Sequence, residues 1–157
     1  MNVDGNVLTI DTILPNLKAG NQKRAFHVIT EYAAKHTGIE QIKLYNRLMA
    51  QERTTSCSGI GGGVAILQIT AKLIKEPYLL FAKAQTPLDY DSVDGNPVDL
   101  FALVISPEED GPVHLQRLAK FSRLLRDTEL CKKLRGIDDL DTIRALLSGM
   151  TETSLAA

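Results

Sequence analysis

The stretch S-C-S-G-I-G-G-G-V-A-I-L-Q-I-T, which spans residues 56–70, decides how the rest of the chain is interpreted. Four of its residues are glycines: Gly59, Gly61, Gly62 and Gly63. Glycine adopts positive φ readily and lets other groups approach its N–H closely. The apolar run at residues 64–67 that follows is typical of a buried strand. The segment is therefore predicted to form a turn that leads into a strand, with Gln68 at the far end of that strand.

The composition is that of one globular domain. The chain has 157 residues, of which 44% are hydrophobic and 24% charged, and this length can bury a core. The net charge of −1 gives no bulk attraction to nucleic acid or to an anionic membrane. No apolar run reaches the roughly 18–20 residues that span a bilayer, and the first residues lack a secretory-signal pattern. Cys57 and Cys131 lie far apart and are expected to be reduced thiols, which favours a cytoplasmic protein.

Helical and strand-like patterns lie on both sides of the glycine segment. The expected strands are residues 7–14 (a short edge strand ending at Pro15), 64–67, 78–83 and 98–106, with a loop at 85–97. The expected helices run from Asn21 to Gly38 and from about Glu40 to Arg53, and three more begin near Pro112, at Asp127 and at Asp138 or Asp139. This order predicts a single α/β domain over residues 1–150, in which helices flank one mixed sheet. Residues 151–157 are expected to form a flexible tail.

Common nucleotide-binding and hydrolase motifs do not fit the glycine segment. A Walker A loop requires a lysine after its glycines, and none follows here. A Rossmann fingerprint would need a third glycine where Val64 stands, and it would open a helix rather than a strand. Ser56 and Ser58 do not lie in a G-x-S-x-G elbow. Nucleotide binding and serine hydrolysis are therefore not predicted.

The three histidines differ in what their positions suggest. His27 and His36 fall on polar or boundary positions of the first helix and are expected at the surface. Histidines this widely spread predict no metal site, and no cofactor is expected. His114 follows Pro112 in the first turn of a helix, where free N–H groups and the helix dipole favour an anion such as phosphate. The pattern alone favours the other interpretation of His114, which is an exposed histidine without a role.

A resemblance to a known family becomes visible across several segments. Residues 59–66 (G-I-G-G-G-V-A-I) resemble the G-I-G-x-G-V-A-I-P-H-G-K signature of enzyme IIA proteins of the bacterial phosphotransferase system, in the mannitol/fructose type and its nitrogen-regulatory branch. Residues 86–100 are similar to that family's T-P-I-x-F-D-A-x-D-x-x-P-V-D-L block, and residues 114–118 to its H-L-x-x-L helix start. Residues 13–15 and 134–135 also fit. The resemblance spans residues 6–148, and the stand-alone length without a fused sugar permease favours the nitrogen-regulatory branch.

This resemblance implies phosphoryl-relay chemistry with one departure. In the family, a histidine on this strand accepts a phosphoryl group from a small histidine phosphocarrier protein, and a second histidine orients it. Here residues 67–70 read L-Q-I-T in place of P-H-G-K, so Gln68 occupies the acceptor position while His114 keeps the second histidine. A carboxamide has no ring nitrogen to attack phosphorus. The resemblance therefore implies that Gln68 marks an inactive acceptor position.

The resemblance also implies a binding surface for phosphate or for a partner protein. In the family, N–H groups of the glycine loop help to hold the phosphate, and an Arg-Glu pair precedes the loop. That pair appears here as Glu52-Arg53, shifted by one position. The implied binding residues are Arg53, Ser58, Gly59, Gly61, Gly62 and Gly63.

Three functions are compatible with these residues. The first is a nitrogen-regulatory protein that binds partners without accepting a phosphoryl group. By resemblance, its partners would be the histidine phosphocarrier protein, regulators of potassium transport or sensor kinases, and a homodimer is compatible with it. The second is an active phosphocarrier that uses His114, and the third is a sensor of small anions. The family consists of phosphotransferases, whereas this chain is expected to be inactive.

Overall fold

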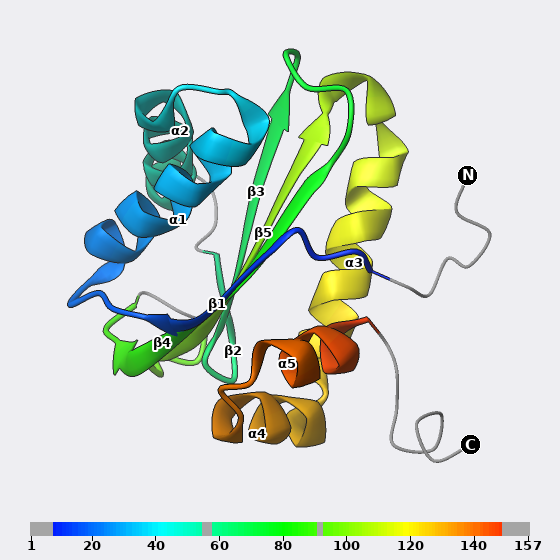
Figure 1. Cartoon of the computed structure of the whole chain (residues 1–157). Helices are drawn as coiled ribbons and strands as arrows, with labels where there is room; N and C mark the ends of the chain where they lie inside the picture. The colour runs from blue at the N-terminus through cyan, green and yellow to red at the C-terminus, as the bar shows by residue number, and fades with distance from the viewer. Residues whose placement is uncertain (1–7, 55–57, 91–92, 149–157) are drawn as a thin grey trace, which may run out of the picture.

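The computed structural model describes residues 8–54, 58–90 and 93–148. The strands are β1 (Thr12–Leu17), β2 (Gly59–Gly61), β3 (Val64–Ala71), β4 (Tyr78–Leu88) and β5 (Val98–Pro107). The helices are α1 (Gln22–Thr37), α2 (Gln41–Thr54), α3 (Pro112–Arg126), α4 (Thr128–Gly136) and α5 (Leu140–Leu147), with a 3₁₀ turn η1 (Glu108–Asp110) before α3. Figure 1 shows these elements arranged around one sheet.

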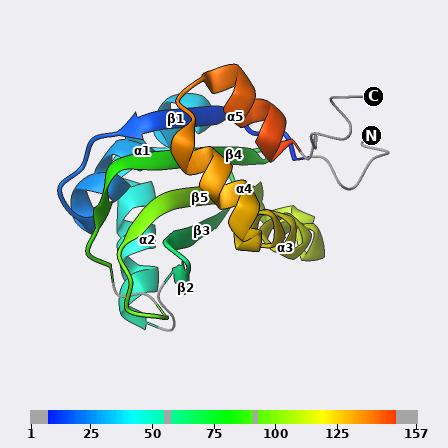
Figure 2. The same cartoon turned by 90° about the horizontal axis from the view of Figure 1, so that it is seen from below.

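The five strands form one mixed sheet in the order β1-β4-β5-β3-β2. β1 runs parallel to β4 and β3 runs parallel to β5, whereas the β4–β5 and β2–β3 pairs are antiparallel. Helices cover both faces of this sheet, as Figure 2 shows. The predicted class, an α/β domain with a mixed sheet flanked by helices, is confirmed.

Each face of the sheet carries its own apolar layer. On one face, α1 and α2 contribute side chains such as Phe26 that pack with Leu67 of β3. On the other face, α3, α4 and α5 contribute side chains such as Phe121 that pack with Val104 of β5. Because β5 is covered on both faces, its sequence is almost continuously apolar.

Several predicted helix ends are confirmed by their caps. Asn21 Oδ1 accepts a hydrogen bond from the Arg24 N–H (2.8 Å), which fixes the start of α1. Gly38, with a φ of 79°, ends the same helix. Asp127 and Asp139 accept hydrogen bonds from the first-turn N–H groups of α4 and α5, so both of these helices begin where the sequence predicts.

Several predicted strand boundaries are wrong. β1 begins at Thr12, because residues 8–11 form no strand. β1 does not end at Pro15 but passes through it, because β1 is an edge strand and its register with β4 is irregular between Leu14 and Leu17. Proline lacks an N–H, and an edge position of this kind tolerates that loss. β4 continues through residues 85–88, which were predicted to be a loop, because its antiparallel pairing with β5 resumes where Leu88 meets Val98.

The glycine segment forms a hairpin rather than only a turn. Residues 59–61 are the short strand β2, which pairs antiparallel with the start of β3. The backbone reverses at Gly61, Gly62 and Gly63, where φ is 102°, 66° and 79°. β3 continues to Ala71 because it pairs with β5 along its whole length, so Gln68 lies inside the strand and not at its end. The predictions for residue 7, Ser56, Cys57 and the 151–157 tail lie outside the described residues.

Candidate functional site

Gln68 and His114 meet on the face of the sheet that α3 covers. Side chains alternate along a strand, so Gln68 of β3 shares its face with Val64 and Ile66, which belong to the apolar layer under α3. His114 is the third residue of α3, and its Nε2 atom lies 2.9 Å from Gln68 Oε1. Gln68 is exposed, whereas His114 is only 5% exposed. His114 is therefore not the exposed histidine that its sequence pattern favoured, because α3 presses the ring against β3 and β5.

Three further polar side chains continue this contact. Ser106, at the end of β5, is fully buried, and its Oγ lies 2.7 Å from His114 Nδ1. Arg117, one helical turn after His114, donates from one Nη1 to Ser106 Oγ (2.9 Å) and to Asp110 Oδ2 (2.6 Å). A continuous row of hydrogen bonds thus runs from Asp110 of η1 to Gln68 of β3. We call these five residues the polar chain.

The surroundings of His114 favour its neutral form. Burial lowers the pKa of the His114 imidazole from its ordinary value of 6.5, and the Arg117 guanidinium lowers that pKa further. Asp110 acts in the opposite direction but is the smallest of the three influences. A neutral imidazole has one N–H and one nitrogen lone pair, and here both ring nitrogens already have partners. The ring is therefore placed to hold hydrogen bonds rather than to attack an electrophile.

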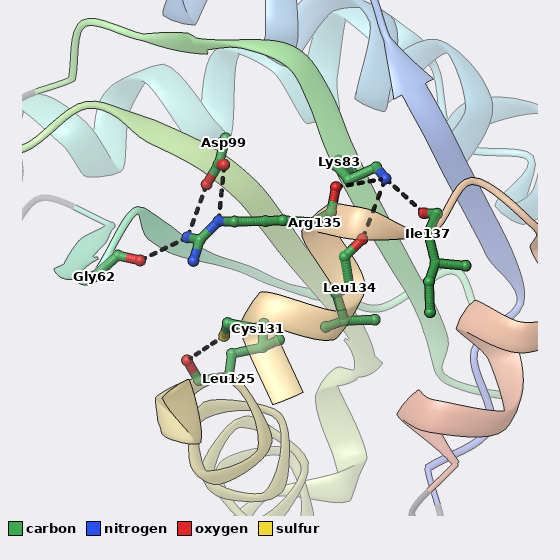
Figure 3. Close-up of polar contacts among 8 residues, drawn as sticks. All are labelled: Gly62, Lys83, Asp99, Leu125, Cys131, Leu134, Arg135 and Ile137. Carbon is green, nitrogen blue, oxygen red and sulfur yellow. Dashed lines mark hydrogen bonds and ion pairs between the residues drawn. The ribbon is translucent and has the colours of Figure 1, made fainter. Parts of the chain in front are cut away.

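The predicted phosphate-binding glycines lie at the opposite end of β3. The Gly62 N–H donates to Asp94 Oδ2 (2.9 Å), and the Gly62 carbonyl accepts a hydrogen bond from Arg135 Nη2 (2.7 Å; Figure 3). Because a strand rises about 3.3 Å per residue, Gln68 is about 13 Å from the start of β3 at Val64. The structure therefore does not bring the glycine turn together with Gln68 and His114.

The glycine turn is held instead by an ion pair from α4. Arg135 donates to both carboxylate oxygens of Asp99, from Nε (2.8 Å) and from Nη2 (2.9 Å), as Figure 3 shows. This hydrogen bonding raises the Arg135 pKa. The pair lies directly against Gly63, where an added Cβ would stand 2.6 Å from Arg135 Nη2 and 2.9 Å from Asp99 Oδ1. Since Gly63 also has positive φ, only glycine fits there without strain.

A buried lysine near this turn was not found from the sequence. Lys83 lies in β4 and is 6% exposed. Its ammonium group donates to the carbonyls of Leu134 (3.1 Å) and Ile137 (2.6 Å), as Figure 3 shows. It also donates to Asp138 Oδ1 (2.9 Å). Leu134 lies in the last turn of α4 and Ile137 directly follows the helix, a region where carbonyls lack partners within the helix. The one sequence signal for a buried lysine is its place as the last residue of the otherwise apolar strand predicted at residues 78–83. We call Lys83, Asp99 and Arg135, together with Gly62 and Gly63, the anchor.

Arg53 and Ser58 lie away from the polar chain. Arg53 is exposed near the end of α2, a helix on the opposite face of the sheet from Gln68. Glu52 accepts hydrogen bonds from the Ser58 N–H (2.9 Å) and from Gln22 Nε2 (3.0 Å). The Ser58 hydroxyl bonds to the Tyr90 hydroxyl. No contact within the described residues links Arg53 or Ser58 to Gln68 or His114.

The remaining candidates behave as surface or core groups. His27 lies near Glu31, and the exposed His36 lies near Asp11. Cys131 is a buried free thiol, and burial raises its pKa. Within the described residues, no group of three or more His, Cys, Asp or Glu side chains could hold a metal ion. The helices of that same part of the chain are too short or too polar to cross a membrane.

Comparison with known proteins gives a family for this arrangement. The sequence model of the phosphoenolpyruvate-dependent sugar phosphotransferase system EIIA 2 family matches residues 6–150. The chain belongs to this family. A nitrogen regulatory protein from Bradyrhizobium diazoefficiens is 36% identical over 138 residues, which cover 88% of this chain and 90% of that protein. The nitrogen regulatory protein of Escherichia coli K12 is 29% identical over 133 residues, which cover 83% of this chain and 80% of that protein.

Solved structures of enzyme IIA proteins share the fold. The nitrogen regulatory protein IIA-Ntr of Neisseria meningitidis matches with a TM-score of 0.81 at 24% identity. The match covers 91% of this chain and 97% of the Neisseria protein. Mannitol enzyme IIA of Escherichia coli, solved in complex with phosphorylated mannitol enzyme IIB, matches with a TM-score of 0.73 at 17% identity over 90% of this chain and 97% of the other. The resemblance to enzyme IIA proteins is therefore confirmed.

Proposed function

We propose that this enzyme IIA-family protein is a nitrogen-regulatory type protein that acts by binding partner proteins and accepts no phosphoryl group at residue 68. The observation that carries this proposal is the 2.9 Å contact between Gln68 Oε1 and His114 Nε2. It puts a carboxamide beside the second histidine, where the resemblance expects the acceptor imidazole. Phosphoryl acceptance needs a nucleophilic lone pair, and the lone pair of an amide nitrogen is delocalised.

The same contact supports a state resembling that of an unphosphorylated enzyme IIA. Gln68 is neutral and adds no dianionic group to the surface. Val113 and Leu115, which flank His114 in the sequence, are 42% and 64% exposed and provide apolar surface on the first turn of α3. By resemblance, the partners would be the histidine phosphocarrier protein, regulators of potassium transport or sensor kinases in the cytoplasm.

A phosphoryl-transfer assay tests this proposal. The protein is incubated with the histidine phosphocarrier protein, the enzyme that charges it, and labelled phosphoenolpyruvate. We expect no acid-labile label on the parent chain. We expect label on the Gln68→His variant, because an imidazole beside His114 supplies the missing nucleophile. Stoichiometric acid-labile label on the parent chain would overturn the proposal.

The His114→Ala variant separates the proposal from an active carrier that uses His114. If the parent chain were labelled and His114→Ala were not, His114 would be the acceptor. The contacts give this alternative less support, because both ring nitrogens are hydrogen-bonded and the side chain is buried. The anion-sensor alternative also has less support, because the Gly62 N–H already binds Asp94. Raised thermal stability in millimolar phosphate would favour it.

A further inference from the structure

The polar chain has a direction, which is set at its Arg117 end. A guanidinium group has only donors, so each of its hydrogen bonds must end on an acceptor. Arg117 Nη1 donates to Asp110 Oδ2 (2.6 Å) and to Ser106 Oγ (2.9 Å). Ser106 Oγ is thus an acceptor toward Arg117, and its single proton remains to be placed.

The Ser106 proton has one acceptor within the described residues. The Ser106 hydroxyl is fully buried, and its hydrogen-bond partners there are Arg117 and His114 Nδ1, which lies 2.7 Å away. If Nδ1 carried a proton, Ser106 would accept from both neighbours, and its own proton would be buried without a partner. A buried polar hydrogen without a partner is unfavourable. The proton of Ser106 therefore points to Nδ1.

The direction of the remaining hydrogen bonds in the polar chain follows from the position of the Ser106 proton. With Nδ1 an acceptor, neutral His114 carries its proton on Nε2. Nε2–H then donates to a carbonyl oxygen, so the Gln68 Oε1 atom faces the ring at 2.9 Å. The Gln68 NH2 group is left on the other side of an exposed side chain. Without Ser106 and Arg117, both tautomers could form: Nε2–H would pair with the Gln68 amide oxygen, and an unprotonated Nε2 would pair with a Gln68 NH2 group turned toward it.

We infer that Ser106 and Arg117 are positioning residues that hold His114 as the Nε2–H tautomer and thereby turn the Gln68 carboxamide so that its NH2 group faces outward. The inference rests on the proposed function in one respect, namely that residue 68 faces the partner. A partner that docks there must then offer a hydrogen-bond acceptor to Gln68, such as a backbone carbonyl or a carboxylate. A partner that offers only donors at that point would meet unpaired N–H groups.

The charges around the ring agree with this assignment. Arg117 and Asp110 are the charged groups that act on His114, and burial together with Arg117 keeps the ring neutral. A doubly protonated ring would direct an Nδ1–H at Ser106, which already accepts a hydrogen bond from Arg117. The direction of the hydrogen bonds therefore requires a neutral ring, and the surroundings of His114 favour that neutral form.

Nuclear magnetic resonance of the nitrogen-15-labelled full chain tests the tautomer directly, since protonated and unprotonated imidazole nitrogens differ widely in chemical shift. In the parent chain we expect a protonated Nε2 and an unprotonated Nδ1 on His114. In Arg117→Met, the Nε2–H preference should fall by about tenfold, the scale of one hydrogen bond. The double variant Ser106→Ala/Arg117→Met should lose at least as much. An unchanged preference in either variant, or a parent ring protonated on Nδ1, would overturn the inference.

Two matched controls and one further readout sharpen the test. Arg123→Met and Ser122→Ala make the same chemical changes at two residues of α3 that are not part of the polar chain. Both variants should leave the His114 tautomer unchanged. The Gln68 side-chain NH2 protons should exchange with water as fast as those of the exposed Gln116 on α3. Exchange slower by tenfold or more would mean that the NH2 group faces the ring, which also contradicts the inference.

The outcome is distinguishable from failure of the proposed function. Label on the parent chain together with an Nε2–H ring would overturn the proposed function and leave the positioning roles of Ser106 and Arg117 intact. An unlabelled parent chain with an Nδ1–H ring would do the reverse. Both measurements use the intact parent chain.

Discussion

The two ends of β3 use polar groups in opposite ways. At the glycine end, the anchor brings together residues that lie far apart in the sequence. Arg135 bonds to the Gly62 carbonyl and to Asp99. Lys83 bonds to the Ile137 carbonyl at the C-terminal end of α4. At the other end, the polar chain leads outward from Asp110 and finishes at Gln68, an exposed side chain. One end therefore stabilises the fold, and the other presents a hydrogen-bonding group to solvent.

This difference separates residues that share one sequence motif. The glycines and Gln68 lie within one short segment of the sequence. In the structure they lie toward opposite ends of β3 and contact different residues. A substitution at the anchor should change stability strongly. A substitution at Gln68 should change stability little and chemistry strongly.

The largest effect is expected from Gly63→Ala. A Cβ at this position would meet the Arg135–Asp99 pair and would also force a side chain into positive φ. We expect the free energy of unfolding to fall by about 2–4 kcal/mol, measured by urea denaturation. Gly62→Ala is the matched control, because its φ is also positive but the added Cβ meets open space, and it should cost about 1–2 kcal/mol. Equal costs for the two variants would contradict a role for the ion pair.

Lys83→Met should have the next largest effect. Methionine can occupy the space of the lysine methylene groups, but it leaves the carbonyls of Leu134 and Ile137 without their hydrogen-bond donor. We expect a loss of about 2 kcal/mol in urea denaturation. Lys132→Met on the exposed face of α4 should stay within about 0.5 kcal/mol of the parent.

The pH dependence of stability reports on His114 at the other end of the strand. Its folded-state pKa lies below the unfolded value, so the unfolded chain binds more protons at acidic pH. The free energy of unfolding should therefore decrease as pH falls below about 6.5, until the folded-state pKa is passed. Denaturation of the parent chain and of His114→Gln at pH 7.5 and at lower pH measures this contribution. Identical pH slopes for the two proteins would show that His114 does not cause it.

Gln68→His should have the smallest effect on stability. The side chain is exposed, so the free energy of unfolding should stay within about 0.5 kcal/mol of the parent. The same variant is the one expected to gain acid-labile label in the phosphoryl-transfer assay. A large loss of stability would mean that Gln68 supports the fold as well as facing outward.

The sequence predicts the elements of the fold better than the contacts between them. Asn21, Gly38, Asp127 and Asp139 act through neighbouring residues, so local patterns find the helix ends that they make. The strand limits at Pro15 and at residues 85–88 depend on pairing with distant strands, and local chemistry misplaced them.

The site was found only in part. The family resemblance paired Gln68 with His114, but the pattern around His114 alone favoured an exposed residue. Ser106 and Arg117 were not singled out, because their roles depend on how α3 packs against β5. Arg135 reaches Gly62 across 73 positions in the sequence, a contact that periodicity cannot reveal. Side-chain pairing at such separations follows from strand register and helix packing, which only the folded chain defines.

The proline in β1 has a consequence for self-association. β1 borders the sheet, and an uninterrupted border strand offers its free backbone groups as a template for another chain. Pro15, with the irregular register beside it, removes an amide donor from the middle of that border. Joining of two copies into one continuous sheet through β1 is thereby disfavoured.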